Sequence, residues 1–342
     1  MKFGIFDHMD RGAVPLGEQY ESRLRLIEAY DRAGFHAYHL AEHHATPLGM
    51  APSPSVFLAA VAQRTRRLRF GPLVYTLSLH HPLRVAEEIC MLDHMSGGRF
   101  EFGIGRGISP LELTAFGVDA AQAQAIYIEA LEVILQALTR ESVDFEGKFF
   151  RFHDVSIEMA PVQQPHPPLW YGVARPEGAA WPAQHKVNIA TNTPAERARL
   201  ITDAYRAAWT AAGNPLAALP LVGMNRHIVI ADSEAAALAS ARRAYLVWYA
   251  SFMKLWIRHN AKPPNAMYPD NFDDLQRIGL GVAGTPARVR AVLAEQVEAA
   301  GINYLACRFA FGDLGFEEAQ RSVALFVEHV MPGLAADARA RE

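Results

Sequence analysis

The chain has 342 residues, of which 51% are hydrophobic and 20% charged, and its formal net charge is −3. This composition is typical of a soluble globular protein, and so small a charge gives no reason to expect a nucleic acid or a membrane surface as partner. The apolar runs are short and interrupted by charge, and the start at Met1 leaves no room for a signal peptide. Cys90 and Cys307 lie in no metal or redox spacing, so we expect a cytoplasmic protein without disulfides.

The first hundred residues alternate predicted strands with predicted helices. Apolar runs predict strands at 2–6, 36–39, 68–77 and 99–104, and apolar spacing with helix-start signals predicts helices at about 20–34, 53–64 and 82–94. This rhythm is typical of a parallel sheet or barrel. An eight-stranded α/β barrel takes about 250 residues plus insertions, so the chain is long enough for one.

The rhythm is interrupted in the middle of the chain and then resumes. A helix at 122–138, an alternating hairpin pattern at 145–157 and a proline-rich connector at 161–168 predict an insertion between the fourth and fifth barrel strands. Four more strands, at 169–174, 187–190, 224–231 and 303–311, alternate with helices. We therefore predict a single α/β domain over residues 1–342, a TIM-like (β/α)8 barrel with a lid near 258–281 and a frayed tail after Gly333.

Polar side chains follow the second predicted strand, in the sequence Glu42-His43-His44. Ligands bind at the carboxyl ends of the strands in such barrels. Because successive side chains of an extended chain point to opposite sides, only one of the two histidines should face the barrel mouth. There it could act as a general acid or base, or donate a hydrogen bond to a developing oxyanion. The alternative is a pair of strand-end histidines that only bond to the backbone.

Two further strand ends suit an anion. Arg106 lies between glycines at the end of the fourth strand, where backbone N–H groups and the guanidinium could hold a phosphate, or where a tight turn carries a surface arginine. The glycines are not placed as in a dinucleotide-binding fold. The segment from Ala174 to Gly178 leads from the fifth strand into a helix whose first N–H groups point outward. His80-His81-Pro82 fits a loop before a helix.

Together these residues resemble the luciferase-like flavin monooxygenases, the superfamily of bacterial luciferase. The similarity covers nearly the whole chain, from Met1-Lys2-Phe3-Gly4 and Glu42-His43-His44 to Gly284-Thr285-Pro286 and Val330-Met331-Pro332. It is most specific over LDHMSGGRF, which begins at Leu92, and over the following FGIGRG, which ends at Gly107.

The resemblance implies a barrel that holds reduced FMN, supplied by a separate NAD(P)H-dependent flavin reductase, and that oxidises a small organic substrate with molecular oxygen through a peroxyflavin. It implies that His43 is the catalytic histidine and that Arg106 contacts the FMN phosphate. A non-proline cis peptide under the flavin ring is implied at Leu73-Val74. The remaining phosphate contacts are implied for Ala174, Arg175, Pro176, Glu177 and Gly178. The resemblance also suggests a homodimer.

Two departures from the family pattern bear on the activity that the resemblance implies. Luciferase has a reactive cysteine where this chain has Gly105, and many relatives have a phosphate-binding serine where it has Gly178. Both argue against light emission. Three alternatives stay open: a deazaflavin-dependent oxidoreductase on the same fold, a flavin-binding protein without turnover, and a metal-dependent barrel hydrolase that uses His43, His44, His81 and a carboxylate. The last lacks an early His-x-His pair, so we expect no metal. We expect an apolar, neutral substrate because the predicted pocket segments carry no charge cluster.

Overall fold

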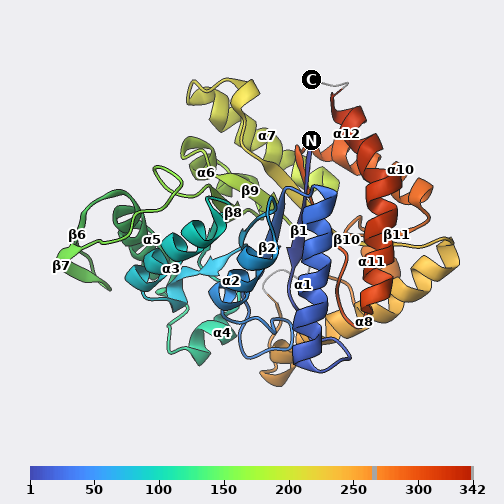
Figure 1. Cartoon of the computed structure of the whole chain (residues 1–342), viewed down its shortest axis with the longest axis horizontal. Coiled ribbons are helices and arrows are strands. Elements are labelled where there is room, and N and C mark those ends of the chain that lie inside the picture. Colours follow the sequence, from blue (N-terminus) through green and yellow to red (C-terminus); the bar gives the residue numbers. More distant parts are fainter. Residues whose placement is uncertain (264–267, 340–342) are drawn as a thin grey trace.

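The structure, a computed structural model, describes residues 1–263 and 268–339. Parallel strands form a barrel with helices around it (Figure 1). In the order of their pairing the strands are β3 (Arg69–Pro72), β2 (Ala37–Leu40), β1 (Lys2–Asp7), β12 (Tyr304–Arg308), β10 (Val222–Ile230), β9 (Asn188–Thr191), β8 (Leu169–Gly172), β5 (Phe102–Gly105) and β4 (Tyr75–Thr76). β3 and β4 are the two parts of one interrupted barrel strand, and a parallel β-bridge between Phe70 and Phe100 closes the barrel. The described part of the chain therefore forms the (β/α)8 barrel that the alternation predicted.

Helices follow the strands and cover the outside of the barrel. They are α1 (Leu16–Ala33), α2 (Pro54–Arg64), α3 (Pro82–Ser96), α6 (Ala180–Gln184), α7 (Ala195–Ala211), α8 (Glu234–Arg258), α10 (Pro286–Ala300) and α11 (Phe316–Leu325). α1 and α10 both end where a glycine, Gly34 or Gly301, takes the left-handed conformation. A π-helical turn and α12 (Met331–Arg339) continue α11. The tail predicted to fray after Gly333 is therefore helical as far as Arg339, because Leu334 is buried against the core.

The insertion lies between β5 and β8, as predicted. It comprises α4 (Pro110–Ala115), α5 (Ala123–Thr139) and an antiparallel hairpin of β6 (Ser142–Glu146) and β7 (Arg151–Ser156). The hairpin projects from the side of the barrel, at the left of Figure 1. α5 packs against α3, so the insertion thickens the wall of the barrel beside β5.

Two predictions need correction. The third strand is not continuous over 68–77, because it breaks after Pro72, and a short 3-10 turn, Leu77–Leu79, follows β4. The stretch 258–281 is not uniformly irregular: it contains α9 (Phe272–Arg277), capped by Asn271, and an extra strand, β11 (Gly281–Gly284), begins at its end and pairs with β10. α9 forms because Phe272 and Leu275 are buried beside α8. Residues 264–267 of the predicted lid lie outside the described residues, and lid closure stays a prediction.

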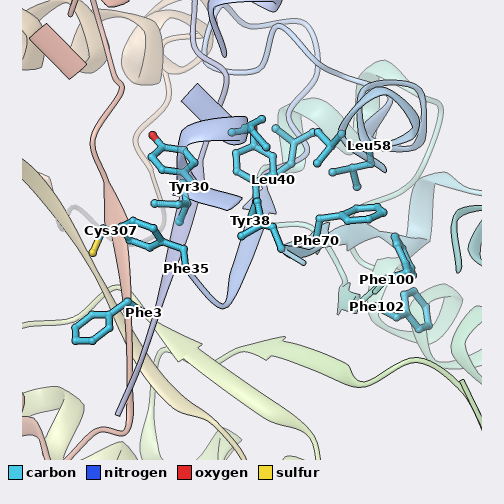
Figure 2. Close-up of a cluster of buried hydrophobic side chains, with 14 of the residues drawn as sticks. Phe3, Tyr30, Phe35, Tyr38, Leu40, Leu58, Phe70, Phe100, Phe102 and Cys307 are labelled. Carbon is cyan, nitrogen blue, oxygen red and sulfur yellow. The ribbon is translucent and has the colours of Figure 1, made fainter. Parts of the chain in front are cut away.

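Apolar side chains form two layers, one between the strands and helices and one inside the barrel. Figure 2 shows part of the outer layer, where Tyr30 of α1 and Leu58 of α2 lie near Tyr38 and Leu40 of β2. The inner layer includes Phe6, Leu73, Trp170 and Tyr304. No helix among residues 1–263 and 268–339 is both long enough and apolar enough to cross a membrane.

The parallel pairing places the carboxyl ends of all barrel strands at one end. In Figure 1 both termini lie at the top and β1 runs downward from the N-terminus, so the carboxyl ends face the bottom of the view, where α4 lies. The sequence analysis placed the candidate site residues at these strand ends. The fold therefore brings the predicted groups after β2, β5 and β8 to the same end of the molecule. The prediction that residues 1–342 form one domain stays a prediction.

Candidate active site

Glu42 organises the loop after β2. Its side chain is buried, and its two oxygens accept hydrogen bonds from the backbone N–H of Thr76 (2.8 Å), from His44 Nε2 (2.8 Å) and from His80 Nε2 (2.7 Å). Burial by itself would raise the pKa of Glu42, but the hydrogen bonds from His44 and His80 hold that pKa at about 2. His80, predicted to be an ordinary loop residue, therefore helps to fix the β2 and β4 ends relative to each other.

His43 faces away from this network, as the alternation of side chains predicted. Its Nδ1 lies 3.1 Å from Oε1 of Glu112 in α4, and the other oxygen of Glu112 accepts the backbone N–H of His44 at 2.9 Å. Because a carboxylate can only accept, this contact favours the proton on Nδ1 and leaves Nε2 as an acceptor. The ring of His8, which follows β1, lies 5.4 Å from the ring of His43. His43 is thus held by α4 and directed toward the β1 side of the barrel mouth.

The break in the third strand lies at the peptide bond between Leu73 and Val74, which is cis. The resemblance implied a cis bond at this position. Neighbouring β5 approaches it closely: a Cβ atom on Gly105 would lie 2.3 Å from Cγ2 of Val74, and one on Gly103 would lie 2.0 Å from the carbonyl oxygen of Pro72. Glycine at position 105, where luciferase has cysteine, therefore has a packing reason in this chain.

Arg106 and Arg175 follow strands that pair with each other. β5 pairs with β8, with Ile104 opposite Tyr171, so the two arginine-bearing loops leave adjacent strand ends. Both arginine side chains are exposed, and neither forms an ion pair with another described residue. The carbonyl oxygen of Arg106 accepts a hydrogen bond from Ser78 at 2.7 Å, which fixes the turn, and its Nε donates to the carbonyl oxygen of Gly107 at 3.3 Å. Two available cations therefore lie at neighbouring positions of the same end of the barrel.

The segment after β8 differs in detail from the prediction. This segment was expected to lead directly into a helix, but Pro176–Gly178 form a 3-10 turn and α6 begins only at Ala180. The N–H groups of Gly178 and Ala179 close this turn on the carbonyl oxygens of Arg175 and Pro176. A Cβ on Gly172 would meet nothing within 4 Å, so the approach to the segment is open. Ala174, Arg175, Glu177 and Gly178 are all exposed.

Several polar residues of this end were missed in the sequence. His8 could have been found by the rule that identified His43, because it directly follows a strand. Arg308 is a lone arginine in an apolar predicted strand, which is also a readable signal. Nothing in the sequence marks Glu112, because it contacts His43 only where α4 packs over the loop after β2 in the folded chain. In the described ranges, no group of three or more His, Cys, Asp or Glu side chains is arranged to hold a metal ion.

A hollow of about 750 Å³ lies at the opposite end of the barrel, where the strands begin. Phe3, His36, Arg69 and Arg99 are among the residues that line it. The guanidinium groups of Arg69 and Arg99 are occupied by hydrogen bonds to Glu101 and to carbonyl oxygens of the protein. In barrels of this kind the strand starts contribute stability, so this hollow is a weaker candidate for chemistry than the mouth.

The sequence model of the luciferase-like monooxygenase family matches residues 1–304, and the chain belongs to this family. An uncharacterized protein, y4wF, of Sinorhizobium fredii is 46% identical over 315 residues, which cover 92% of each chain. The oxygenase component of the flavin-dependent trigonelline monooxygenase of Acinetobacter baylyi is 27% identical over 265 residues, or 76% of this chain and 72% of that protein.

Solved structures agree with this assignment. The monooxygenase RslO1 of Streptomyces bottropensis superposes with a TM-score of 0.87 at 29% identity, covering 97% of this chain and 99% of its own. Two more distant structures share the fold. They are the oxygenating constituent of 3,6-diketocamphane monooxygenase of Pseudomonas putida in complex with FMN (TM-score 0.80, 18% identity) and the coenzyme F420-dependent tetrahydromethanopterin reductase of Methanopyrus kandleri (TM-score 0.70, 19% identity).

Proposed function

We propose that this protein is the oxygenase component of a two-component monooxygenase that uses reduced FMN and molecular oxygen to oxidise a small organic substrate. Bound reduced FMN would supply the electrons that activate oxygen. The single observation that carries the proposal is that His43, the cis peptide at Leu73-Val74 and Arg106 lie at one end of a barrel of the luciferase-like family. A relative described as an oxygenase component supports the two-component arrangement.

The residues after β5 and β8 fit a phosphate. Arg106 and Arg175 are exposed cations without ion-pair partners in the described chain, and the space beside Gly172, at the end of β8, is open. A guanidinium can grip phosphate oxygens with two parallel hydrogen bonds. We assign Arg106 as the main phosphate contact, and Ala174, Arg175, Pro176, Glu177 and Gly178 as the surrounding cradle.

The residues between β1 and β4 fit a flat, largely apolar ring. Leu73 and Val74 present apolar side chains near the inner layer of the barrel, and Phe6 and Ala41 belong to the same cluster. We assign Leu73 and Val74 as the floor on which the flavin ring lies. A barrel interior so rich in buried apolar side chains would also exclude water from the reacting atoms.

His43 is assigned as the catalytic residue, because its Nε2 is the group at the β2 end best placed to exchange a proton. Glu112 holds Nδ1–H, so the ring keeps one orientation and one tautomer. Nε2 would then accept a proton from the reacting centre or hold a hydrogen bond to an oxygen there. Glu112 acts through His43 and is a positioning residue.

The proposal implies three partners: the organic substrate, an NAD(P)H-dependent flavin reductase that delivers reduced FMN, and a second copy of the chain in a homodimer. Aromatic side chains of α8 lie beside the mouth, with Trp248 within 5.7 Å of His8 between ring centres. We propose that α8, the insertion and the lid segment wall the substrate pocket.

Anaerobic titration of the purified protein tests this assignment. Photoreduced FMN and a reduced deazaflavin are titrated in parallel, followed by protein fluorescence, and the FMN complex is then mixed with oxygenated buffer. We expect saturable binding of reduced FMN and reoxidation kinetics different from those of free reduced FMN. Binding of the deazaflavin without binding of reduced FMN would instead favour hydride transfer on this fold, which the F420-dependent structural neighbour illustrates.

A further inference from the structure

One buried arginine at the barrel mouth has no role in the function proposed above. Arg308 is the last residue of β12, and only 1% of its surface is exposed. β12 pairs with β1 and β10. In the order of the barrel strands it is therefore opposite β3, β4 and β5, whose ends are assigned to the flavin. Its guanidinium lies over the ring of Phe6 (4.9 Å to the ring centre) and beside the ring of Trp248 (5.5 Å).

The guanidinium forms a hydrogen bond along one edge, whereas the nitrogens of the other edge have no hydrogen bond of full geometry to a described residue. Nη1 donates to Nε2 of His227, the residue opposite it on β10, at 2.6 Å. Nε and Nη2 are both buried and have no hydrogen-bond partner among residues 1–263 and 268–339. These two atoms form the same side of the planar group, with parallel N–H bonds that match the two oxygens of a carboxylate.

No carboxylate of the described residues compensates this charge at ion-pair distance. Asp10 and Asp7 are the acidic side chains that act on Arg308, but Asp7 is paired with Arg23 at 3.4 Å, and Asp10 accepts the N–H of Gly312. Burial raises the pKa of Asp10 to about 7, so this carboxyl is only partly charged at neutral pH. The groups that face Arg308 therefore leave a net positive charge in an apolar site.

The remaining neighbours are aromatic or neutral. Burial lowers the pKa of His8 and of His227 well below the ordinary value, so neither adds a charge at neutral pH. Trp248 donates its indole N–H to His8 at 3.3 Å, and Phe311 packs edge-on against His227 at 4.9 Å. The hydroxyl of Tyr268 is buried and has no hydrogen bond of full geometry to a described residue. It nevertheless lies close enough to Arg308 to act on the pKa of that arginine as a hydrogen-bonding neighbour, and after burial it is the largest influence there.

We propose that Arg308 is the anion-recognition residue of the substrate pocket, and that the substrate carries a carboxylate on a flat or aromatic body. The open Nε/Nη2 edge would bind the carboxylate, with the hydroxyl of Tyr268 as a third donor. Phe6 and Trp248 would enclose the attached ring. Burial of an arginine without a partner costs free energy, and a ligand carboxylate would offset that cost.

This inference revises the apolar, neutral substrate expected from the sequence. No charge cluster is visible along the chain because Arg308 and Tyr268 come from segments 40 residues apart. A planar carboxylate is favoured over a phosphate, because one guanidinium edge and one hydroxyl match two oxygens in a plane. The inference rests on the proposed function, since it takes the mouth of the barrel as the substrate site.

The test measures ligand binding without flavin, so that it succeeds or fails independently of reduced-FMN binding. Four carboxylates and their matched amides serve as probes: benzoate, nicotinate, phenylacetate and octanoate, with benzamide, nicotinamide, phenylacetamide and octanamide. Binding is followed by calorimetry and by tryptophan fluorescence, to which all five tryptophans contribute, in the wild type, Arg308→Met, Arg308→Lys and Tyr268→Phe. Arg226→Met is the control, because Arg226 is a buried arginine of adjacent β10 whose Nε and Nη1 bond Gln296 and the carbonyl oxygen of Thr193. Only its Nη2 lacks a partner among the described residues, so it offers no two-nitrogen edge.

We expect at least one aromatic carboxylate to bind the wild type about tenfold or more tightly than its amide, and Arg308→Met to abolish this preference. Arg308→Lys should retain part of it, Tyr268→Phe should weaken it a few-fold, and Arg226→Met should leave it unchanged in folded protein. Equal binding of carboxylates and amides across the panel would overturn the proposal. So would a carboxylate preference that survives Arg308→Met, or loss of reduced-FMN affinity in that variant without any carboxylate preference in the wild type.

Discussion

Glu101, at the N-terminal end of the barrel, and Arg308, at the C-terminal end, differ in how their buried charge is held. At the N-terminal end, Glu101 accepts hydrogen bonds from Arg69 (2.6 Å) and Trp170 (2.5 Å), and His36 lies 3.6 Å from it. At the C-terminal end, Arg308 has no carboxylate partner among the described residues, and one edge of its guanidinium is open. Removing one partner of a compensated buried charge destabilises the fold, whereas a buried charge without a carboxylate partner can receive one from a ligand. The difference follows the general division of such barrels into strand starts that stabilise the fold and strand ends that bind ligands. Glu42, at the mouth, is compensated like Glu101, so the missing carboxylate sets Arg308 apart from its neighbours at the same end.

The largest expected effect concerns His43 at the C-terminal end. His43→Ala should lower oxidation of any substrate that the wild type turns over by about 1,000-fold, because it removes a group placed for proton transfer. The measurement is incorporation of labelled oxygen into product, with reduced-FMN affinity determined in parallel. His36→Ala, at the other end, should leave turnover of the folded protein unchanged. Equal loss in both variants would contradict a division of roles between the ends.

The free energies of unfolding of two variants, one at each end of the barrel, test whether Glu101 serves the fold and Arg308 serves binding. Glu101→Gln should lower the free energy of unfolding by about 3 kcal/mol, because it leaves Arg69 and His36 without their buried carboxylate. Arg308→Met should change it by less than about 1 kcal/mol, because an uncompensated buried charge gives way to an apolar side chain of similar length. Urea denaturation of both variants gives the two values. A larger loss in Arg308→Met would mean that Arg308 serves the fold.

Acid unfolding sharpens this comparison. Burial raises the pKa of Glu101, but the nearby His36, His39 and Arg69 outweigh it and hold that pKa at about 2. Since an unfolded glutamate titrates near about 4.3, the unfolded state binds more protons between these values, and stability falls as pH drops from about 4.5 to 2. In Glu101→Gln the unfolding free energy should fall less steeply with decreasing pH, because the difference in bound protons between the unfolded and folded states is smaller by about one. Unfolding free energies measured across this pH range give both slopes, and identical slopes would refute the assigned role of Glu101.

The smallest expected effect concerns the phosphate cradle. Arg106→Ala should weaken binding of reduced FMN by about tenfold and leave binding of reduced riboflavin, which lacks the phosphate, nearly unchanged. Anaerobic fluorescence titration with both flavins measures the difference. Arg84→Ala, an exposed arginine of α3 paired with Glu87, is the control. If both flavins lose affinity equally, Arg106 holds the loop rather than the phosphate.

Much of the fold could be predicted because its signals are local. Alternating apolar runs and helix-start patterns predicted the barrel strands and helices, the insertion and its hairpin. Glycines at positions 34 and 301 marked the ends of two helices. β11 and α9 were missed, because pairing with β10 and burial of Phe272 beside α8 decide them. The tail beyond Gly333 was misjudged for the same reason, since burial of Leu334 against the core keeps it helical.

The candidate site divides in a similar way. The sequence placed His43, Arg106 and Arg175 at strand ends, since the rule that ligands meet strand ends needs only the order of elements. Which side chain holds His43 could not be predicted, because α4 returns to the β2 loop from 69 residues farther along the chain. The roles assigned to these residues stay predictions until flavin binding is measured.

The sequence by itself determined the family, the alternation that closes the barrel and the end at which polar groups gather, because these depend on periodicity and on neighbouring residues. Only the tertiary structure decided which buried charges are compensated. Arg69, the partner of Glu101, comes from β3, which lies beside the segment before β5. It also decided that Arg308 and Tyr268, far apart in the chain, share one aromatic enclosure without a carboxylate of the described residues beside them. Compensation of buried charge depends on three-dimensional distance, which the order of residues does not contain.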